Sequence, residues 1–271
     1  MYEMRNLPVG IQDFEDLRTS NCVYVDKTAY VHRLASFGKP YFLGRPRRFG
    51  KSLFLSTLKA YFQGKKDLFD GLAIAGLEKD WIEYPVIHID FTLGDVNRLE
   101  TLVSTLMLNL EYAEKQLDIS FNGIDEPAGR FGRLIKDACS KTGRKVVVLI
   151  DEYDKPLLAS MGNPELNEEM RNVLKSFYGV LKGSDASLRF AFLTGVTKFS
   201  KVSVFSDLNQ LQDISMDKRF SGVCGISEEE LLRDFQPELQ ALAEETGKTR
   251  DGAFAEMKKR YDGYHFAARS E

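Results

Sequence analysis

"FLGRPRRFGKSLFLSTLKAYF", residues 42–62, joins a short apolar run to an amphipathic segment. The run PYFLG, residues 40–44, is bounded by a proline and a glycine, which predicts a buried parallel strand. Residues 51–62 place apolar side chains at helical spacing, at positions 53, 54, 55, 58, 61 and 62. The sequence therefore predicts a strand, a tight loop and a helix in direct succession.

The loop, residues 45–52 and here termed the GKS loop, carries a phosphate-binding pattern. Gly50, Lys51 and Ser52 match the end of G-x-x-x-x-G-K-[ST], in which the glycine admits the phosphates, the lysine reaches the β- and γ-phosphates and the hydroxyl binds Mg²⁺. Arg45 occupies the first glycine position, and Gly44 comes one residue early. Because arginine must take an ordinary φ there, we expect the loop entry to depart from the usual path.

The arginines inside the GKS loop have two interpretations. Arg47 and Arg48 brace the loop against a carboxylate such as Asp154, which is the preferred interpretation, or they stabilise charge on the transferring phosphoryl group. Backbone and side chains of the loop together form the predicted nucleotide-binding set: Pro46, Arg47, Arg48, Phe49, Gly50, Lys51, Ser52 and Leu53.

A second motif, VVVLIDEYDKP, follows about a hundred residues later. Residues 146–150 are five consecutive aliphatic residues that predict a central strand, and they end at Asp151 and Glu152. In this order the first carboxylate lies near Mg²⁺, and the second polarises the attacking water as a general base. The metal ligands are then Ser52 and Asp151. A solvated strand end or an acidic helix start is the alternative.

Two further strand ends carry polar residues. Residues 188–195 predict a buried strand in which Thr194 faces the γ-phosphate and joins Glu152 and Lys51 in the predicted catalytic set. Thr197 is the rival for that role, and a hydroxyl that caps the strand end is the alternative for both. Asp90 ends a strand predicted over 84–91, where it tunes the site or is an ordinary strand-end carboxylate.

Strands that alternate with helices predict an α/β fold with a mainly parallel sheet covered on both faces. Ser227 and Glu230 form a capping-box pattern that opens a helical segment. We expect three parts: an N-terminal extension packed on the core (1–39), the core (40–215) and a small helical appendage (216–271). The helices of the core are expected near 98–117, 130–139 and 165–181, after an N-terminal helix that begins at Lys27 or Thr28.

Composition excludes several classes of protein. The chain of 271 residues has 43% hydrophobic and 28% charged residues, which indicates a folded protein. A net charge of −3 offers no support for nucleic-acid binding. No segment approaches the length of a membrane span, so the cytoplasm is the expected location. Cysteines and histidines lack metal-ligand spacing and predict reduced thiols and hydrogen-bonded imidazoles: Cys22, Cys139, Cys224, His32, His88 and His265.

Together, LPVGIQDFEDLR, YVDKT, the GKS loop region, IDEYDKP and LTGVTKFSKVSVFSDLNQLQDIS resemble the predicted AAA-ATPase-like family of bacterial proteins. The Arg45 form of the loop is itself typical of that family. The resemblance covers about residues 5–266 and implies a P-loop NTPase fold, a three-layer α/β/α arrangement with an added strand between the two motif strands. It also implies ATP or ADP and Mg²⁺ as cofactors, Lys51 and Ser52 as their ligands, Asp151 as the metal-binding acid and Glu152 as the base.

The predicted function is an Mg²⁺-dependent ATPase that hydrolyses ATP to drive a conformational switch. The alternative is a nucleotide-gated protein-interaction module with little turnover, and a small-molecule phosphotransferase is third. Relatives often carry a C-terminal nuclease-like domain, so such a domain or a protein partner is expected beyond this chain. The aromatic residues Tyr261, Tyr264 and Phe266 pack on the helical appendage, or they form a docking surface that promotes self-association.

Overall fold

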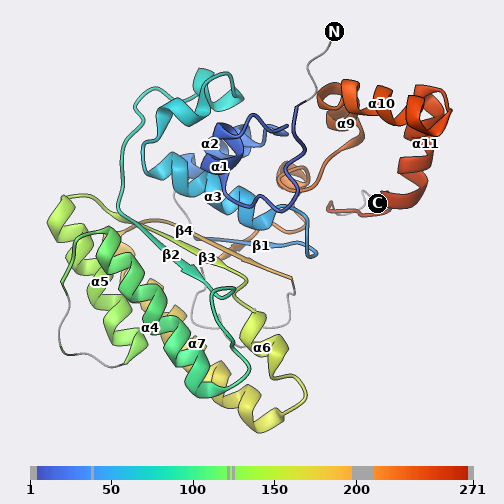
Figure 1. Ribbon diagram of the computed structural model, residues 1–271. Helices are drawn as coiled ribbons and strands as arrows, with labels where there is room; N and C mark the ends of the chain where they lie inside the picture. The colour runs from blue at the N-terminus through green and yellow to red at the C-terminus, as the bar shows by residue number, and fades with distance from the viewer. Residues whose placement is uncertain (1–4, 38–39, 121–122, 124–125, 197–209, 268–271) are drawn as a thin grey trace.

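A parallel sheet forms the centre of the fold. The computed structural model describes residues 5–37, 40–120, 123, 126–196 and 210–267. Within them, five strands form one sheet in the order β2-β3-β4-β1-β5 (Figure 1), and each pair of neighbours is parallel. The strands are β1 (Pro40–Gly44), β2 (Val86–Asp90), β3 (Val146–Asp151), β4 (Leu188–Gly195) and β5 (Gln212–Asp213).

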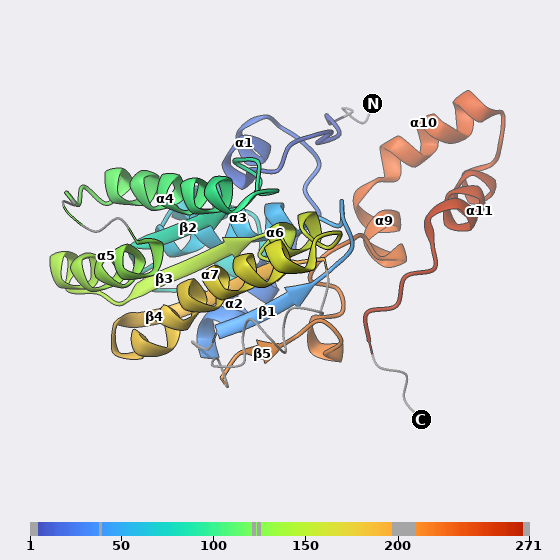
Figure 2. The same cartoon turned by 90° about the horizontal axis from the view of Figure 1, so that it is seen from below.

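Helices cover both faces of this sheet. One layer contains α1 (Phe14–Thr19), α2 (Thr28–Phe37) and α3 (Lys51–Phe62), and the other contains α4 (Leu99–Gln116), α5 (Pro127–Thr142), α6 (Lys155–Ala159) and α7 (Pro164–Gly183), as Figures 1 and 2 show. The short 3₁₀ helices are η1 (Lys66–Phe69), η2 (Ala73–Gly76), η3 (Asp185–Ser187) and η4 (Lys218–Phe220). The predicted three-layer α/β/α arrangement is confirmed.

The C-terminal helices stand beside the sheet and form the helical appendage (Figure 2). They are α9 (Glu228–Asp234), α10 (Gln236–Thr246) and α11 (Arg250–Tyr261). Helix α9 begins with the predicted capping box, in which Ser227 and Glu230 each bond the other's backbone N–H. Glu230 also pairs with Lys27 at 2.5 Å, so the appendage is tied to the N-terminal segment.

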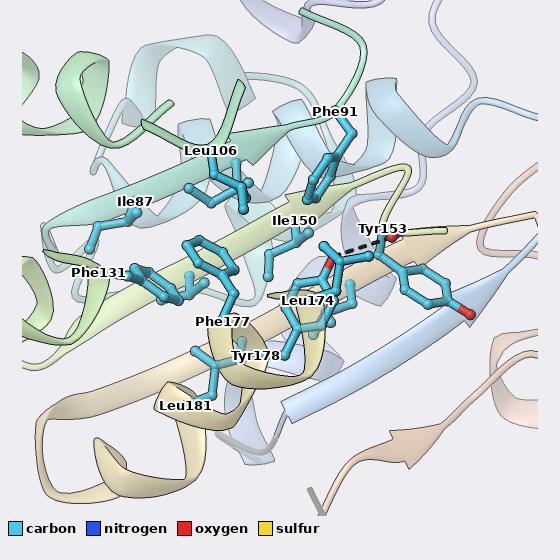
Figure 3. Packing of buried hydrophobic residues seen from close by; sticks show 14 of the residues in the cluster. Ile87, Phe91, Leu106, Phe131, Ile150, Tyr153, Leu174, Phe177, Tyr178 and Leu181 are labelled. Atoms are coloured by element: carbon cyan, nitrogen blue, oxygen red, sulfur yellow. Dashed lines mark hydrogen bonds between the residues drawn. The ribbon is translucent and has the colours of Figure 1, made fainter. Parts of the chain in front are cut away.

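Strand β3 separates two hydrophobic cores. Val148 and Ile150 face α4, α5 and α7, where Ile150 lies near Phe177 (Figure 3), while Val147 and Leu149 face α3. All six residues of β3 are buried. A strand covered on both faces has no polar side to expose, which explains its uninterrupted aliphatic run.

Strand β4 lies between β1 and β3, as the family resemblance implied. Its register pairs Leu43 with Thr194 on one side and Ile150 with Leu193 on the other. Because the strands are parallel, their carboxyl ends meet at one edge of the sheet. The GKS loop after β1, Asp151 at the end of β3 and Thr194 near the end of β4 therefore lie at the same edge.

Candidate functional site

The GKS loop has an unusual backbone. Arg48 and Gly50 lie in the left-handed region, at φ 66° and 84°, and Phe49 between them has a negative φ. Left-handed residues of this kind occur in anion-binding concavities called nests, in which successive N–H groups point toward one side. Helix α3 starts at Lys51 with no side chain capping its N-terminus. Its free N–H groups and dipole add positive potential at the same place.

Lys51 and Glu152 meet at this loop. Their Nζ and Oε1 atoms are 3.0 Å apart, and the Lys51 side chain is only 4% exposed. Lys51 also donates to the Pro46 carbonyl at 3.3 Å. Glu152 has a φ of 52°, a conformation that costs a non-glycine residue of order 1–3 kcal/mol and concentrates at functional sites.

Tyr153 holds Glu152 in that conformation. Its backbone N–H donates to the Thr194 carbonyl at 2.9 Å, and its carbonyl accepts from the Tyr178 hydroxyl at 3.2 Å (Figure 3). The buried Tyr153 ring packs edge-on against Phe42, with centroids 5.3 Å apart. The core thereby fixes the backbone that places Glu152 at the pocket.

Asp151 and Thr194 form a second pair of contacts. The Thr194 hydroxyl donates to Asp151 Oδ1, and the Glu152 N–H donates to the same oxygen at 3.0 Å. Both side chains are buried. The rival Thr197 lies outside the described residues. Asp90 instead closes its own turn by accepting from the Thr92 N–H at 2.7 Å.

A pocket of about 890 Å³ opens over the loop. Ser52 and Leu53 line it together with Lys51 and Glu152. A volume of this size accommodates a nucleotide. Among the described residues that line it, Glu152 is the carboxylate, and five side chains are cationic: Lys27, Arg47, Arg48, Lys51 and Lys155. The balance of charge favours a polyanion.

An apolar wall, which the sequence motifs did not predict, forms another part of the pocket. Its residues come from the N-terminal segment and from both ends of α9: Pro8, Val9, Ile11, Val23, Val25, Val223, Ile226 and Phe235. Val9 is 88% exposed and Ile226 is 56% exposed. The LPVGI pattern signals an apolar turn, but only the fold brings it to the GKS loop.

Lys155 is a second residue that the motifs did not reveal. Its ammonium donates to the carbonyls of Phe91 at 2.9 Å and Gly94 at 3.4 Å, and it lines the pocket on the β2 side. Lys51 lies on the β1 side, so the two lysines line the pocket from different strands.

Arg45, at the first glycine position of the motif, is 1% exposed. Its guanidinium donates to the carbonyls of Gly44 at 2.9 Å, Ser215 at 2.7 Å and Phe220 at 3.1 Å. Burial lowers the pKa of this guanidinium. Arg45 keeps a negative φ, as expected, and ties the loop entry to the chain after β5.

The brace predicted from Arg47 or Arg48 to Asp154 is wrong for the described structure. Both arginines are exposed. Asp154 is 1% exposed and accepts from the Val196 N–H at 3.1 Å. Arg45 supplies the brace instead, because its buried guanidinium reaches backbone carbonyls in the chain after β5.

Metal clusters, membrane-spanning helices and cysteines would be further candidate features of the described residues. Among the described residues, no cluster of His, Cys, Asp and Glu side chains has the arrangement of a metal site. No described helix combines the length and apolarity that crossing a bilayer requires. Cys22, Cys139 and Cys224 are free thiols, and burial raises the pKa of Cys224 to about 11.

The sequence of this chain is similar to those of known proteins. A curated relative, the "Uncharacterized protein in vnfD 5'region" of Azotobacter chroococcum mcd 1, is 44% identical over 264 residues, which cover 97% of this chain and 49% of that protein. The chain thus spans about half of the relative's length. No solved structure matches significantly. The family described as "Predicted AAA-ATPase" matches residues 8–205, and the chain belongs to this AAA-ATPase-like family.

Proposed function

We propose that this chain is an Mg²⁺-dependent ATPase that binds and hydrolyses ATP to drive a conformational switch. The observation that carries the proposal is the meeting of Lys51 and Glu152 in one pocket, 3.0 Å apart, beside the hydrogen-bonded Asp151 and Thr194. Family membership supports an ATPase-like activity. The parallel sheet brings the ends of β1, β3 and β4 to one edge, and the residue types that meet there are the ones that phosphoryl transfer uses.

The residues at the loop fit a magnesium nucleotide. The nest at Arg48 and Gly50 and the uncapped start of α3 suit the phosphates. Lys51 would bind the β- and γ-phosphates, and Ser52 with Asp151 would hold Mg²⁺. When bound, the metal would neutralise charge that develops on the phosphates during transfer.

The apolar wall suits the nucleoside. Val9 and Ile226 are exposed apolar side chains that a flat base would cover, and base burial would remove them from water. The chain contains no N-K-x-D sequence of the kind that selects guanine. Adenine is therefore the proposed base.

Glu152 supplies the switch. In the ion pair, the Lys51 ammonium neutralises the Glu152 carboxylate. Phosphates that take over Lys51 would release Glu152 to orient the attacking water and accept its proton. ATP binding would then break the Lys51–Glu152 ion pair and leave the Glu152 carboxylate able to act as the base. Thr194 would keep Asp151 oriented, and Lys155 adds positive charge to the lining of the pocket.

The alternative is a nucleotide-gated protein-interaction module. The Lys51–Glu152 pair favours it, because a closed pair opposes turnover. Nucleotide content of the purified protein and single-turnover phosphate release from ATP and GTP, with and without Mg²⁺, separate the two. Release of phosphate from ATP that requires Mg²⁺ supports the ATPase, whereas bound nucleotide without turnover supports the module.

The wider setting is also a proposal. We propose an N-terminal extension at 1–39, an ATPase core at 40–215 and an appendage at 216–271. The matched relative is about twice as long, so a nuclease-like domain or a protein partner would receive the conformational signal. Cytoplasmic location and self-association remain predictions.

A further inference from the structure

Two aromatic side chains near the C-terminal end lie against the GKS loop. After α11, residues 263–266, here termed the C-terminal strap, bring the Tyr264 and Phe266 rings to 4.6 and 5.4 Å from the Phe49 ring. The Arg45 guanidinium lies 4.2 Å from the Phe266 ring centroid. Neither of the two predicted placements of these rings included contact with the GKS loop. Tyr261 is 73% exposed.

Phe49 is held from its backbone side as well. The Gly225 N–H donates to the Phe49 carbonyl at 2.9 Å. Phe49 thus has a fixed carbonyl and a ring packed against two others in edge-on geometry, at interplanar angles of 69° and 83°. Such aromatic pairs contribute beyond the area that they bury.

Phe49 occupies the middle of the nest. Arg48 before it has a φ of 66° and Gly50 after it has a φ of 84°. A left-handed arginine is unfavourable in isolation and persists only where its surroundings impose it. The phosphate-binding form of the loop therefore depends on contacts outside the loop, and the C-terminal strap supplies them at the central residue.

We propose that the C-terminal strap positions the GKS loop: its docking on Phe49 holds the loop in the anion-binding form, so that nucleotide binding and strap docking strengthen each other. The inference rests on the proposed function in taking a nucleotide as the ligand. Tyr264 and Phe266 act through Phe49 and Arg45 and touch no reacting atom. Linkage makes the effect reciprocal, because each event stabilises the same loop conformation.

The test uses a Tyr264→Ala/Phe266→Ala variant, with Tyr261→Ala at the end of α11 as the control, because that side chain is exposed. Calorimetry with MgADP should give a Kd about 10-fold weaker in the double variant and unchanged in the control. In the parent, MgADP should slow hydrogen exchange of residues 263–266. A lower melting temperature with an unchanged Kd would reduce the strap to a structural role and overturn the proposal. Tighter MgADP binding, or faster exchange of the strap with MgADP, would also overturn it.

Failure of the proposed ATPase function can be told apart from failure of the strap proposal. If the parent binds neither MgADP nor MgATP, the ATPase assignment fails, and hydrogen exchange of residues 46–52 without nucleotide then tests the strap. Exchange in this loop should be faster in the double variant than in Tyr261→Ala, and equal rates would overturn the proposal. If the alanine variant does not fold, Tyr264→Leu/Phe266→Leu keeps apolar bulk while removing the aromatic contacts, and the same comparisons apply.

Discussion

Lys51 and Glu152 form an ion pair in which the lysine side chain is 4% exposed and the glutamate side chain 19% exposed. The pair joins the start of α3 to the end of β3. Removal of one partner from such a pair leaves the other charge poorly solvated and is more costly than loss of a surface pair. A nucleotide whose phosphates bind Lys51 breaks its ion pair with Glu152, and the new contacts to phosphate must offset that loss.

Lys51→Ala should abolish most of the thermal stabilisation by MgATP. A ligand at 100 times its Kd adds about 2.7 kcal/mol by mass action, and the variant loses the cation that we expect to bind the phosphates. Differential scanning fluorimetry with and without MgATP measures the shift. Lys115→Ala is the control, because that side chain is 68% exposed on α4. A full MgATP shift in Lys51→Ala would mean that the phosphates bind elsewhere.

Glu152→Gln should leave ATP binding intact while hydrolysis falls by roughly 10² to 10⁴, the usual contribution of a general base. The amide keeps the shape but loses the charge, so the variant also lacks the ion pair that competes with phosphate for Lys51. We therefore expect ATP affinity at or above that of the parent. Single-turnover hydrolysis and ATP calorimetry measure the two effects, and parental hydrolysis in the variant would refute the assignment.

Asp151→Asn should weaken Mg²⁺-dependent ATP binding, which Glu152→Gln should leave intact. The carboxylate is buried beside Thr194, and its loss removes a charge that we expect to face Mg²⁺. ATP affinity in the presence of Mg²⁺ should fall, while affinity in EDTA should change little. Titration of ATP with and without Mg²⁺ tests this. Equal loss in both conditions would indicate a folding defect rather than a metal site.

Local patterns predicted the elements that frame the site. The strand at residues 40–44, the helix at 51–62 and the strand at 188–195 occur at the predicted bounds. Each is bounded by proline, glycine or polar residues and has a continuous apolar pattern. Strand β5, in contrast, has two residues and exists because it pairs with Tyr41 and Phe42 of β1, which no local pattern announces.

In the candidate site, too, sequence motifs predicted the residues but not their contacts. Motif spacing identified Lys51 and Glu152 as candidates, but their direct contact depends on the order of strands in the sheet. The partners of Arg45 are backbone carbonyls about 170 residues away, and carbonyls leave no sequence signature. Short-range pattern thus indicates which residues carry chemistry, and tertiary packing decides what each one touches.

His88 should make stability depend on pH. It lies in β2 between the core residues Ile87 and Ile89. Its Nε2 atom is buried and has no hydrogen-bond partner among the described residues. Burial lowers the pKa of its imidazole. Since the folded pKa lies below the unfolded value of about 6.5, the unfolded chain takes up the proton first, and stability falls as pH drops below that value. Between pH 6.5 and 5.5 the loss from this group should be at most about 1 kcal/mol, the limit for an imidazole that stays neutral in the folded protein.

The measurement is urea unfolding from pH 7.5 to 5.5 in the parent, His88→Leu and His32→Leu. His88→Leu should show the shallower pH dependence, and His32→Leu should follow the parent. Identical slopes in all three proteins would assign the pH dependence to other groups.

Arg45→Gly should destabilise the protein although it restores the glycine of the common phosphate-loop motif. The substitution leaves the buried carbonyls of Ser215 and Phe220 without their donor, at about 1–3 kcal/mol for each unsatisfied group, partly offset because a desolvated charge is removed. It also deletes the cation over Phe266. We expect the free energy of unfolding in urea to fall by about 3 kcal/mol and MgADP binding to weaken.

Arg47→Gly is the control for Arg45→Gly, because it introduces the same flexibility at an exposed position of the same loop. If both variants were equally stable, Arg45 would be a tolerated replacement for glycine; a larger loss in Arg45→Gly identifies the buried guanidinium as the residue that anchors this form of the loop.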